Sequence, residues 1–260
     1  MSTEQFFLTA WTWNPLVLII AGVGLAAYLF VFRGEGRPAW LLLALSVFVL
    51  TLVSPLNALA NGYLFSAHML QHILLLLIVP AFFILSLPRS FSLRWRPRFF
   101  AHPVAGWIAG VGAMWFWHWP TLCNAAVASR SVYALQTVSL LVLGILFWIQ
   151  VLAPREEERL SPPGAVLYLF SACVTCSALG VILTFSPVTV CSIYALPVGD
   201  RLGIWETIRT GWGFSPEKDQ QIGGLLMWVP MCLIYLGAIF AQIPRWFGEA
   251  PAASPATQRL

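Results

Sequence analysis

The chain has 260 residues, of which 59% are hydrophobic and only 9% are charged. So few charged side chains cannot cover the surface of an ordinary soluble protein, which excludes a water-soluble domain. The formal net charge of +4 is read as a signal for orientation in a membrane and not as a nucleic-acid-binding surface. The composition predicts an all-α integral membrane protein, folded as a single transmembrane domain over residues 1–260.

Apolar runs long enough to cross about 30 Å of hydrocarbon recur along the whole chain. The runs are uninterrupted, whereas the strands of a membrane barrel would alternate polar and apolar residues. The second and fourth runs are the shortest. We predict a bundle of seven transmembrane helices, with spans at about Pro15–Phe32, Ala39–Val53, Leu64–Leu87, Val104–Trp119, Val132–Leu152, Gly164–Phe185 and Ile222–Ile243.

The orientation follows from the basic residues, because short loops rich in Lys and Arg stay in the cytoplasm. An N-terminus outside and a C-terminus in the cytoplasm place ten of the 14 basic residues inside. The tail, residues 249–260, is rich in Pro, Ala and Ser and is expected to be disordered. The ten inside residues are Arg33, Arg37, Arg89, Arg94, Arg96, Arg98, Arg155, Arg159, Arg245 and Arg259.

This orientation gathers three of the four histidines at the outer face of the membrane. His68 and His72 lie one helical turn apart on one face of the third span, and His118 ends the fourth span. Met114, spaced i, i+4 from His118, and Met227 of the last span add soft donors. Imidazole and thioether ligands favour copper, particularly Cu(I), over calcium or magnesium. We therefore predict a copper site with these three histidines as main ligands and one methionine as an auxiliary donor.

The start of the last span reaches the same layer. Ser215 is a typical N-cap and is followed by a proline at the first helical position. Asp219 and Gln220 come within the first two turns, and we expect them to orient an imidazole or to form an entry point for the metal. Gly223 and Gly224 permit a close approach of a neighbouring helix.

Each of these residues also has a plain structural interpretation. A histidine in a membrane helix is commonly a hydrogen-bonded packing residue, and methionine fills apolar gaps. Cys173 and Cys176 are expected to be small buried residues rather than ligands. Cys123 and Cys191 would face an oxidising compartment, where they either form a disulfide or remain separate thiols.

Four motifs in this order resemble those of the CtaG family of polytopic cytochrome c oxidase assembly factors, over roughly Ser54 to Trp246. The resemblance implies a seven-helix protein of the bacterial plasma (inner) membrane that is needed to mature a haem-copper oxidase. It also implies oxidase subunits as partners, with copper as the metal handled. The motifs are His68-Met69-Leu70-Gln71-His72 followed by Pro80, then His102-Pro103, then Trp117-His118-Trp119-Pro120, and finally the segment from Asp219 to Pro230, DQQIGGLLMWVP.

The chain departs from the family pattern at the start of the fifth span. Members of the family often carry a second histidine pair there, where this chain has Tyr133 and Thr137. The resemblance therefore implies one histidine site and not a mechanism with two metals.

We expect the protein to hold copper at the outer face, to receive it from a periplasmic donor and to deliver it to the oxidase. Two alternatives stay open. One is a b-type haem protein in which His72 and His118 bind one iron, and the other is an assembly scaffold that binds no metal. Nothing in the sequence resembles a catalytic nucleophile or a phosphate-binding loop, so we do not predict an enzyme. A retinal protein is disfavoured because the sole lysine, Lys218, lies at the outer edge of the last span.

Overall fold

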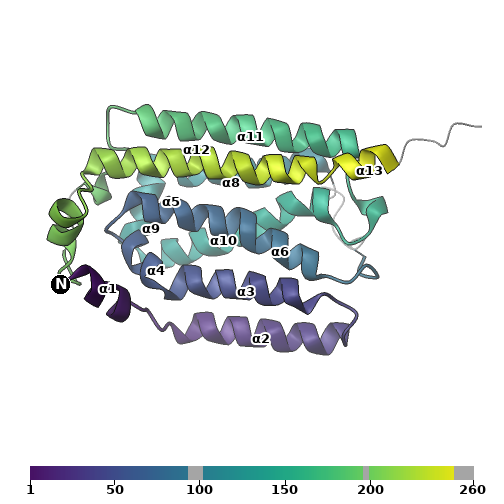
Figure 1. Ribbon diagram of the computed structural model, residues 1–260, viewed down its shortest axis with the longest axis horizontal. Helices are drawn as coiled ribbons and strands as arrows, with labels where there is room; N and C mark the ends of the chain where they lie inside the picture. Colours follow the sequence, from purple (N-terminus) through teal and green to yellow (C-terminus); the bar gives the residue numbers. More distant parts are fainter. Residues whose placement is uncertain (93–101, 196–198, 249–260) are drawn as a thin grey trace, which may run out of the picture.

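The computed structural model describes residues 1–92, 102–195 and 199–248, and within these ranges it contains helices and no β-strand (Figure 1). Every predicted span has its helix. The predicted inner-side residues Arg94, Arg96, Arg98 and Arg259 and the tail 249–260 lie outside the described ranges. The long helices are α2 (Pro15–Phe32), α3 (Pro38–Val53), α5 (Phe65–Ile73) continuing through η1 (Leu74–Ile78) into α6 (Val79–Ser86), α8 (Pro103–Trp117), α10 (Arg130–Leu152), α11 (Pro162–Phe185) and α12 (Pro216–Phe240).

Five of these helices are long and apolar enough to cross a membrane, which makes the protein a multi-pass membrane protein. The other two, α3 and α8, have only 16 and 15 residues. They match the two spans that the sequence marks as shortest. Seven crossings and the orientation of the ends therefore remain predictions.

Consecutive long helices run in opposite directions, so the connections gather at the two ends of the bundle (Figure 1). One end, here called the loop-rich end, carries most of the short elements and is the end predicted to face outside. It holds α1 (Thr3–Thr9), α4 (Pro55–Ala60), α9 (Pro120–Ala128), η3 (Ser192–Tyr194) and η4 (Thr207–Gly211), whereas η2 (Glu156–Glu158) and α13 (Ile243–Gly248) lie at the opposite end.

Several helices, among them α2, α8 and α12, begin with a capping residue followed by proline, which lacks the N–H that a first helical turn leaves unpaired. Asn14 accepts a hydrogen bond from the N–H of Leu16 at the start of α2 (3.0 Å). Ser215 accepts one from the N–H of Lys218 at the start of α12 (3.2 Å), which confirms its predicted capping role. His102 caps α8 through its ring Nδ1, at the opposite end of that helix from His118 and so away from the other three histidines.

The helix that carries two of the histidines is the most enclosed of the five candidate spans. Within its apolar window 61% of the residues of α5–α6 are buried, against 11% for α2 at the edge of the bundle (Figure 1). A π-helical turn, η1, widens the helix just before Pro80, whose ring has no N–H to offer the backbone ladder. A Cβ atom on Gly144 of α10 would clash with the carbonyl oxygen of Leu76, so this glycine lets α10 pack directly on the π-turn.

Candidate functional site

The structure brings His68, His72 and His118 together at the loop-rich end. The ring centroids of His68 and His72 are 4.5 Å apart, and those of His72 and His118 are 5.0 Å apart with ring planes at 89°. All three side chains are at most 4% exposed. Helix α5 supplies two of the rings and the residue that ends α8 supplies the third, so the cluster depends on how these two helices meet.

Most ring nitrogens of the cluster are buried without a partner. Neither nitrogen of His68 nor of His72 makes a hydrogen bond of good geometry with a described residue, although the Gln136 side chain lies close to His72. A buried polar atom left in this state costs about 1–3 kcal/mol. Unpartnered imidazole lone pairs fit a ligand set for a soft or borderline metal ion, and they do not fit the interpretation of these histidines as hydrogen-bonded packing residues.

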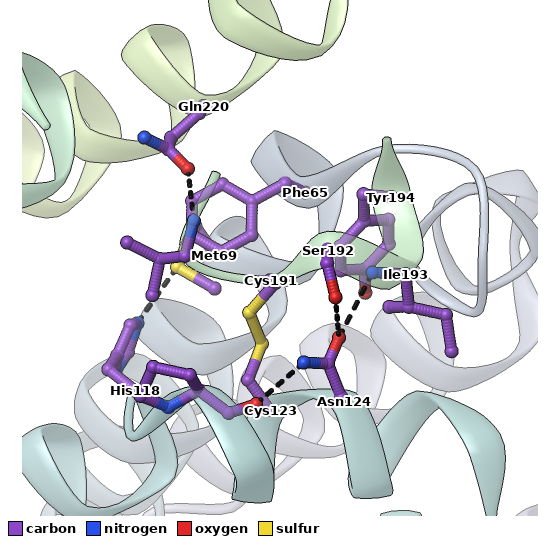
Figure 2. The surroundings of a disulfide bond; sticks show 12 residues. Phe65, Met69, His118, Cys123, Asn124, Cys191, Ser192, Ile193, Tyr194 and Gln220 are labelled. Carbon is purple, nitrogen blue, oxygen red and sulfur yellow. Dashed lines mark hydrogen bonds between the residues drawn. A yellow bond between two sulfur atoms is a disulfide. The ribbon is translucent and has the colours of Figure 1, made fainter. Parts of the chain in front are cut away.

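The contacts of His118 support the same conclusion. His118 Nδ1 lies against the backbone carbonyl of Met114, which only accepts, so Nδ1 carries the proton. His118 Nε2 then presents its lone pair 2.9 Å from the Sδ atom of Met69, which is also an electron-pair donor (Figure 2). Two facing donors of this kind are a contact that a soft cation would relieve.

The side chains as they stand do not form a ready coordination shell. In the described part of the chain, no three His, Cys, Asp or Glu side chains are grouped so that they could hold one metal ion. The three rings therefore have to rotate to share an ion. Their role as metal ligands stays a prediction, as does that of the methionines.

Met69 is the donor that the sequence interpretation missed. It stands between the two histidines of α5, about 100° around the helix from His68, and was therefore not expected to share their surroundings. Gly223 of α12 lets Met69 and Phe65 pack closely against its backbone, because a Cβ atom there would lie 3.1 Å from Met69 Cγ and 2.5 Å from the Phe65 ring. The predicted auxiliary donors Met114 and Met227 are both fully buried.

Gln136 of α10 is a second residue that the sequence interpretation missed. Its side chain lies beside His72, and its amide nitrogen is buried with no hydrogen-bond partner among the described residues. The signal was weak, because a single glutamine in a membrane helix marks no particular chemistry.

Asp219 is hydrogen-bonded to the start of the helix that carries two of the histidines and not to an imidazole ring. Its carboxylate oxygens accept from the backbone N–H groups of Phe65 (2.7 Å) and Ser66 (3.0 Å). These are the first N–H groups of α5, whose own N-cap residue, Leu64, makes no side-chain cap. Asp219 of α12 therefore caps α5 across the bundle and fixes the start of the turn that leads to His68.

Gln220 holds the loop that follows α11. Its Oε1 accepts from the N–H of Val190 (2.7 Å), and its Nε2 donates to the carbonyl of Val188 (3.0 Å). The hydrogen bonds of Asp219 and Gln220 thus go to backbone groups. Neither residue is hydrogen-bonded to an imidazole in the described structure.

The loop over the cluster is fastened by a disulfide between Cys123 of α9 and Cys191. Figure 2 shows the bridge beside Asn124, whose Oδ1 accepts from the N–H of Ile193 (3.0 Å). Three residues past the bridge, Tyr194 places its ring 6.0 Å from that of His68. Of the two states considered for Cys123 and Cys191, the disulfide is the one found, and it holds the segment that places the Tyr194 ring beside His68.

A polar network occupies the region where relatives are expected to carry a second histidine pair. The Tyr133 hydroxyl lies 2.9 Å from Asn57 Oδ1 and 3.2 Å from Gln71 Oε1. Gln71 Nε2 in turn donates to the carbonyl of Thr51 (2.9 Å). The network ties α3, α4, α5 and α10 together with neutral groups, while Thr137 bonds the carbonyl of Tyr133 in its own helix.

Comparison with known proteins gives one family and three distant relatives. Uncharacterized proteins of Mycobacterium bovis and Mycobacterium tuberculosis are each 22% identical over 92% of this chain, and one of Mycobacterium leprae has the same identity and coverage. The chain spans about two fifths of the length of these relatives, 40% in each case. No solved structure matches it significantly.

The family match covers most of the chain. Residues 33–249 match the family described as cytochrome c oxidase caa3 assembly factor, Caa3_CtaG. The matched range contains all four motifs and the whole histidine cluster. The resemblance read from the motifs is confirmed: the chain belongs to the Caa3_CtaG family of cytochrome c oxidase assembly factors.

Proposed function

We propose that this assembly factor binds copper at the outer face of the bacterial plasma membrane and delivers it to a haem-copper oxidase. His68, His72 and His118 are the main ligands in this proposal. The observation that carries it is the set of four buried, unpartnered ring nitrogens of the first two histidines. Met69 adds a soft donor next to His118, and Met114 or Met227 are further candidates. The donor set suits Cu(I) better than a hard cation.

Copper is the cargo in this proposal, so the site has to exchange it. A shell whose ligands must rotate to meet the ion suits release better than a closed four-coordinate cage. Asp219 and Gln220 then support the site indirectly, because their hydrogen bonds hold α5 and the covering loop in place. A periplasmic copper donor supplies the ion, and an oxidase subunit receives it.

The proposed orientation has support that is independent of the arginine count. The disulfide lies at the loop-rich end of the bundle, and disulfides persist in oxidising compartments such as the bacterial periplasm. We therefore propose that the histidine cluster faces outside; with α3 and α8 also crossing, the chain has seven spans, the N-terminus outside and the C-terminus in the cytoplasm.

Haem is the alternative that a specific contact argues against. The rings of His72 and His118 meet edge to face at 5.0 Å, which leaves no gap for a porphyrin between them. A haem would have to separate α5 from the end of α8. A copper ion needs no such separation of the helices, so we prefer it.

The test is metal binding by the detergent-purified protein, reconstituted with Cu(I) under reducing conditions. We expect close to one copper per chain to be lost in a variant with His68→Ala, His72→Ala and His118→Ala. His102→Ala is the matched control, because His102 is exposed and caps a different helix end, and it should bind as the parent does. A Soret band would show a haem protein instead, and binding of neither group would leave a metal-free scaffold.

A further inference from the structure

A second group of sulfur atoms lies deeper in the bundle, away from the histidines. Cys173 of α11 and Cys232 of α12 place their Sγ atoms 3.2 Å apart. The sequence offers no sign of this pair, because the two residues are 59 positions apart and Cys173 matches a helical spacing only with Cys176. Both thiols are free and half-buried in the structure.

Close packing of the two helices sets this approach. A Cβ atom on Gly180 of α11 would lie 2.9 Å from the backbone nitrogen of Trp228 and 3.0 Å from the carbonyl of Gly224, both in α12. The helices are therefore in backbone contact, and the pair lies further along the same seam. At 1.5 Å per residue, the eight residues from Gly224 to Cys232 place the pair about 12 Å deeper in the membrane than that contact.

The surroundings of the cysteine pair favour a soft cation of low charge. Helix α11 has no charged residue, and neither does α12 from Ile222 to Phe240, so an ion here has to form a nearly neutral complex. A monovalent cation bound by one thiolate and one thiol is neutral. Zinc with two thiolates would also be neutral, but zinc takes four ligands, and the structure brings two sulfurs together, with the Ser177 hydroxyl 3.0 Å from Cys232 Sγ.

The distance between the sulfurs suits two-coordinate binding after a small shift. With metal–sulfur bonds of about 2.3 Å, a linear arrangement needs the sulfurs about 4.6 Å apart. Starting from 3.2 Å, each sulfur moves by about 0.7 Å, which a rotation of the cysteine side chains provides. Cys176 is not needed, because its Sγ faces the Tyr235 hydroxyl at 3.8 Å.

We propose that Cys173 and Cys232 form a second, membrane-embedded site for a thiophilic monovalent cation such as Cu(I), about 12 Å below the helix contact at Gly224. The site lies on the α11–α12 seam and shares no residue with the histidine cluster. The two sites can therefore be tested independently, and the failure of one does not refute the other.

The experiment measures Cu(I) binding in the variant that lacks His68, His72 and His118, by competition with a chromophoric Cu(I) chelator in detergent without oxygen. We expect this variant to retain one Cu(I) per chain. Adding Cys173→Ser and Cys232→Ser should abolish that binding, whereas adding Cys176→Ser, the matched control one turn along α11, should preserve it. Unchanged binding after loss of the pair would overturn the proposal.

A second measurement uses the unaltered protein and so does not depend on how the variants fold. Ag(I), a monovalent thiophilic probe, should slow alkylation of Cys173 and Cys232 at least tenfold and leave Cys176 unaffected, as read by tandem mass spectrometry that assigns the alkylated residue within each peptide. Equal protection of all three thiols, or none, would contradict the site. So would finding the pair as a disulfide in protein purified without oxidant, since the sulfurs would then be unavailable to a cation.

Discussion

Replacing Asp219 with alanine removes the cap of α5 and leaves two N–H groups, those of Phe65 and Ser66, buried without an acceptor. Hydrogen bonds to a charged group contribute about 1.5–3 kcal/mol each, so the expected loss of unfolding free energy is about 3–6 kcal/mol. Asp219→Asn keeps one oxygen acceptor but turns an amide NH₂ toward the other N–H. We therefore expect at least about half of the alanine loss.

The assay is unfolding in mixed detergent micelles followed by circular dichroism, together with amide hydrogen exchange at the start of α5. Glu217→Ala is the matched control, because Glu217 lies in the same first turn of α12 but is exposed, and it should change little. Asp219→Ala should also speed exchange at Phe65 and Ser66. If Asp219→Ala were as stable as Glu217→Ala, with exchange unchanged, the carboxylate would not be the cap of the histidine helix.

Three further predictions concern the surroundings of the cluster. Replacing Cys123 and Cys191 with serine opens a bridge between residues 68 positions apart; it should cost up to about 4 kcal/mol and make the covering loop sensitive to protease. Gly223→Ala forces its new methyl group into side chains of α5 and should cost about 1–3 kcal/mol, whereas Gly237→Ala, which meets open space, should cost nothing in thermal unfolding. Burial alone would raise the pKa of Asp200, but hydrogen bonds from backbone N–H groups of its loop outweigh burial, so the pKa lies below its ordinary value of 3.8. The stabilisation by this carboxylate is complete above pH 3.8 and is lost as the pH falls through the lower folded-state pKa. Proteolysis of the loop in the parent should therefore rise below pH 3.8. In Asp200→Asn, proteolysis should depend less on pH.

The sequence predicted the helices well because long apolar runs and their capping residues are local signals. Ser215 followed by proline fixed the start of α12, and the boundaries of α2 agree residue for residue with the predicted span. The break in the third span was not foreseen. Pro80 follows the π-turn, and Gly144 of α10 packs directly on it; such contacts between helices distant in sequence leave no local pattern.

The site was predicted in part, and what was missed also depends on contacts between helices. The spacing of His68 and His72 places both on one face, and the orientation brings His118 to the same depth. The contact of Met69 with His118 depends on a glycine some 150 positions away. Likewise, a carboxylate near imidazoles is ordinarily expected to orient one, whereas Asp219 bonds backbone N–H groups that only the folded bundle places within its reach.

The distribution of satisfied and unsatisfied polar groups is itself an argument about function. The covering loop, the start of α5 and the network around Tyr133 are all hydrogen-bonded. Four ring nitrogens at their centre are not, at a cost of about 1 kcal/mol or more each. That total is a large fraction of the 5–15 kcal/mol that typically holds a domain folded. A metal ion would bind one nitrogen of each neutral ring, so about half of that cost is available to it, and in our proposal a soft cation is the ligand that these rings and the neighbouring thioether suit best.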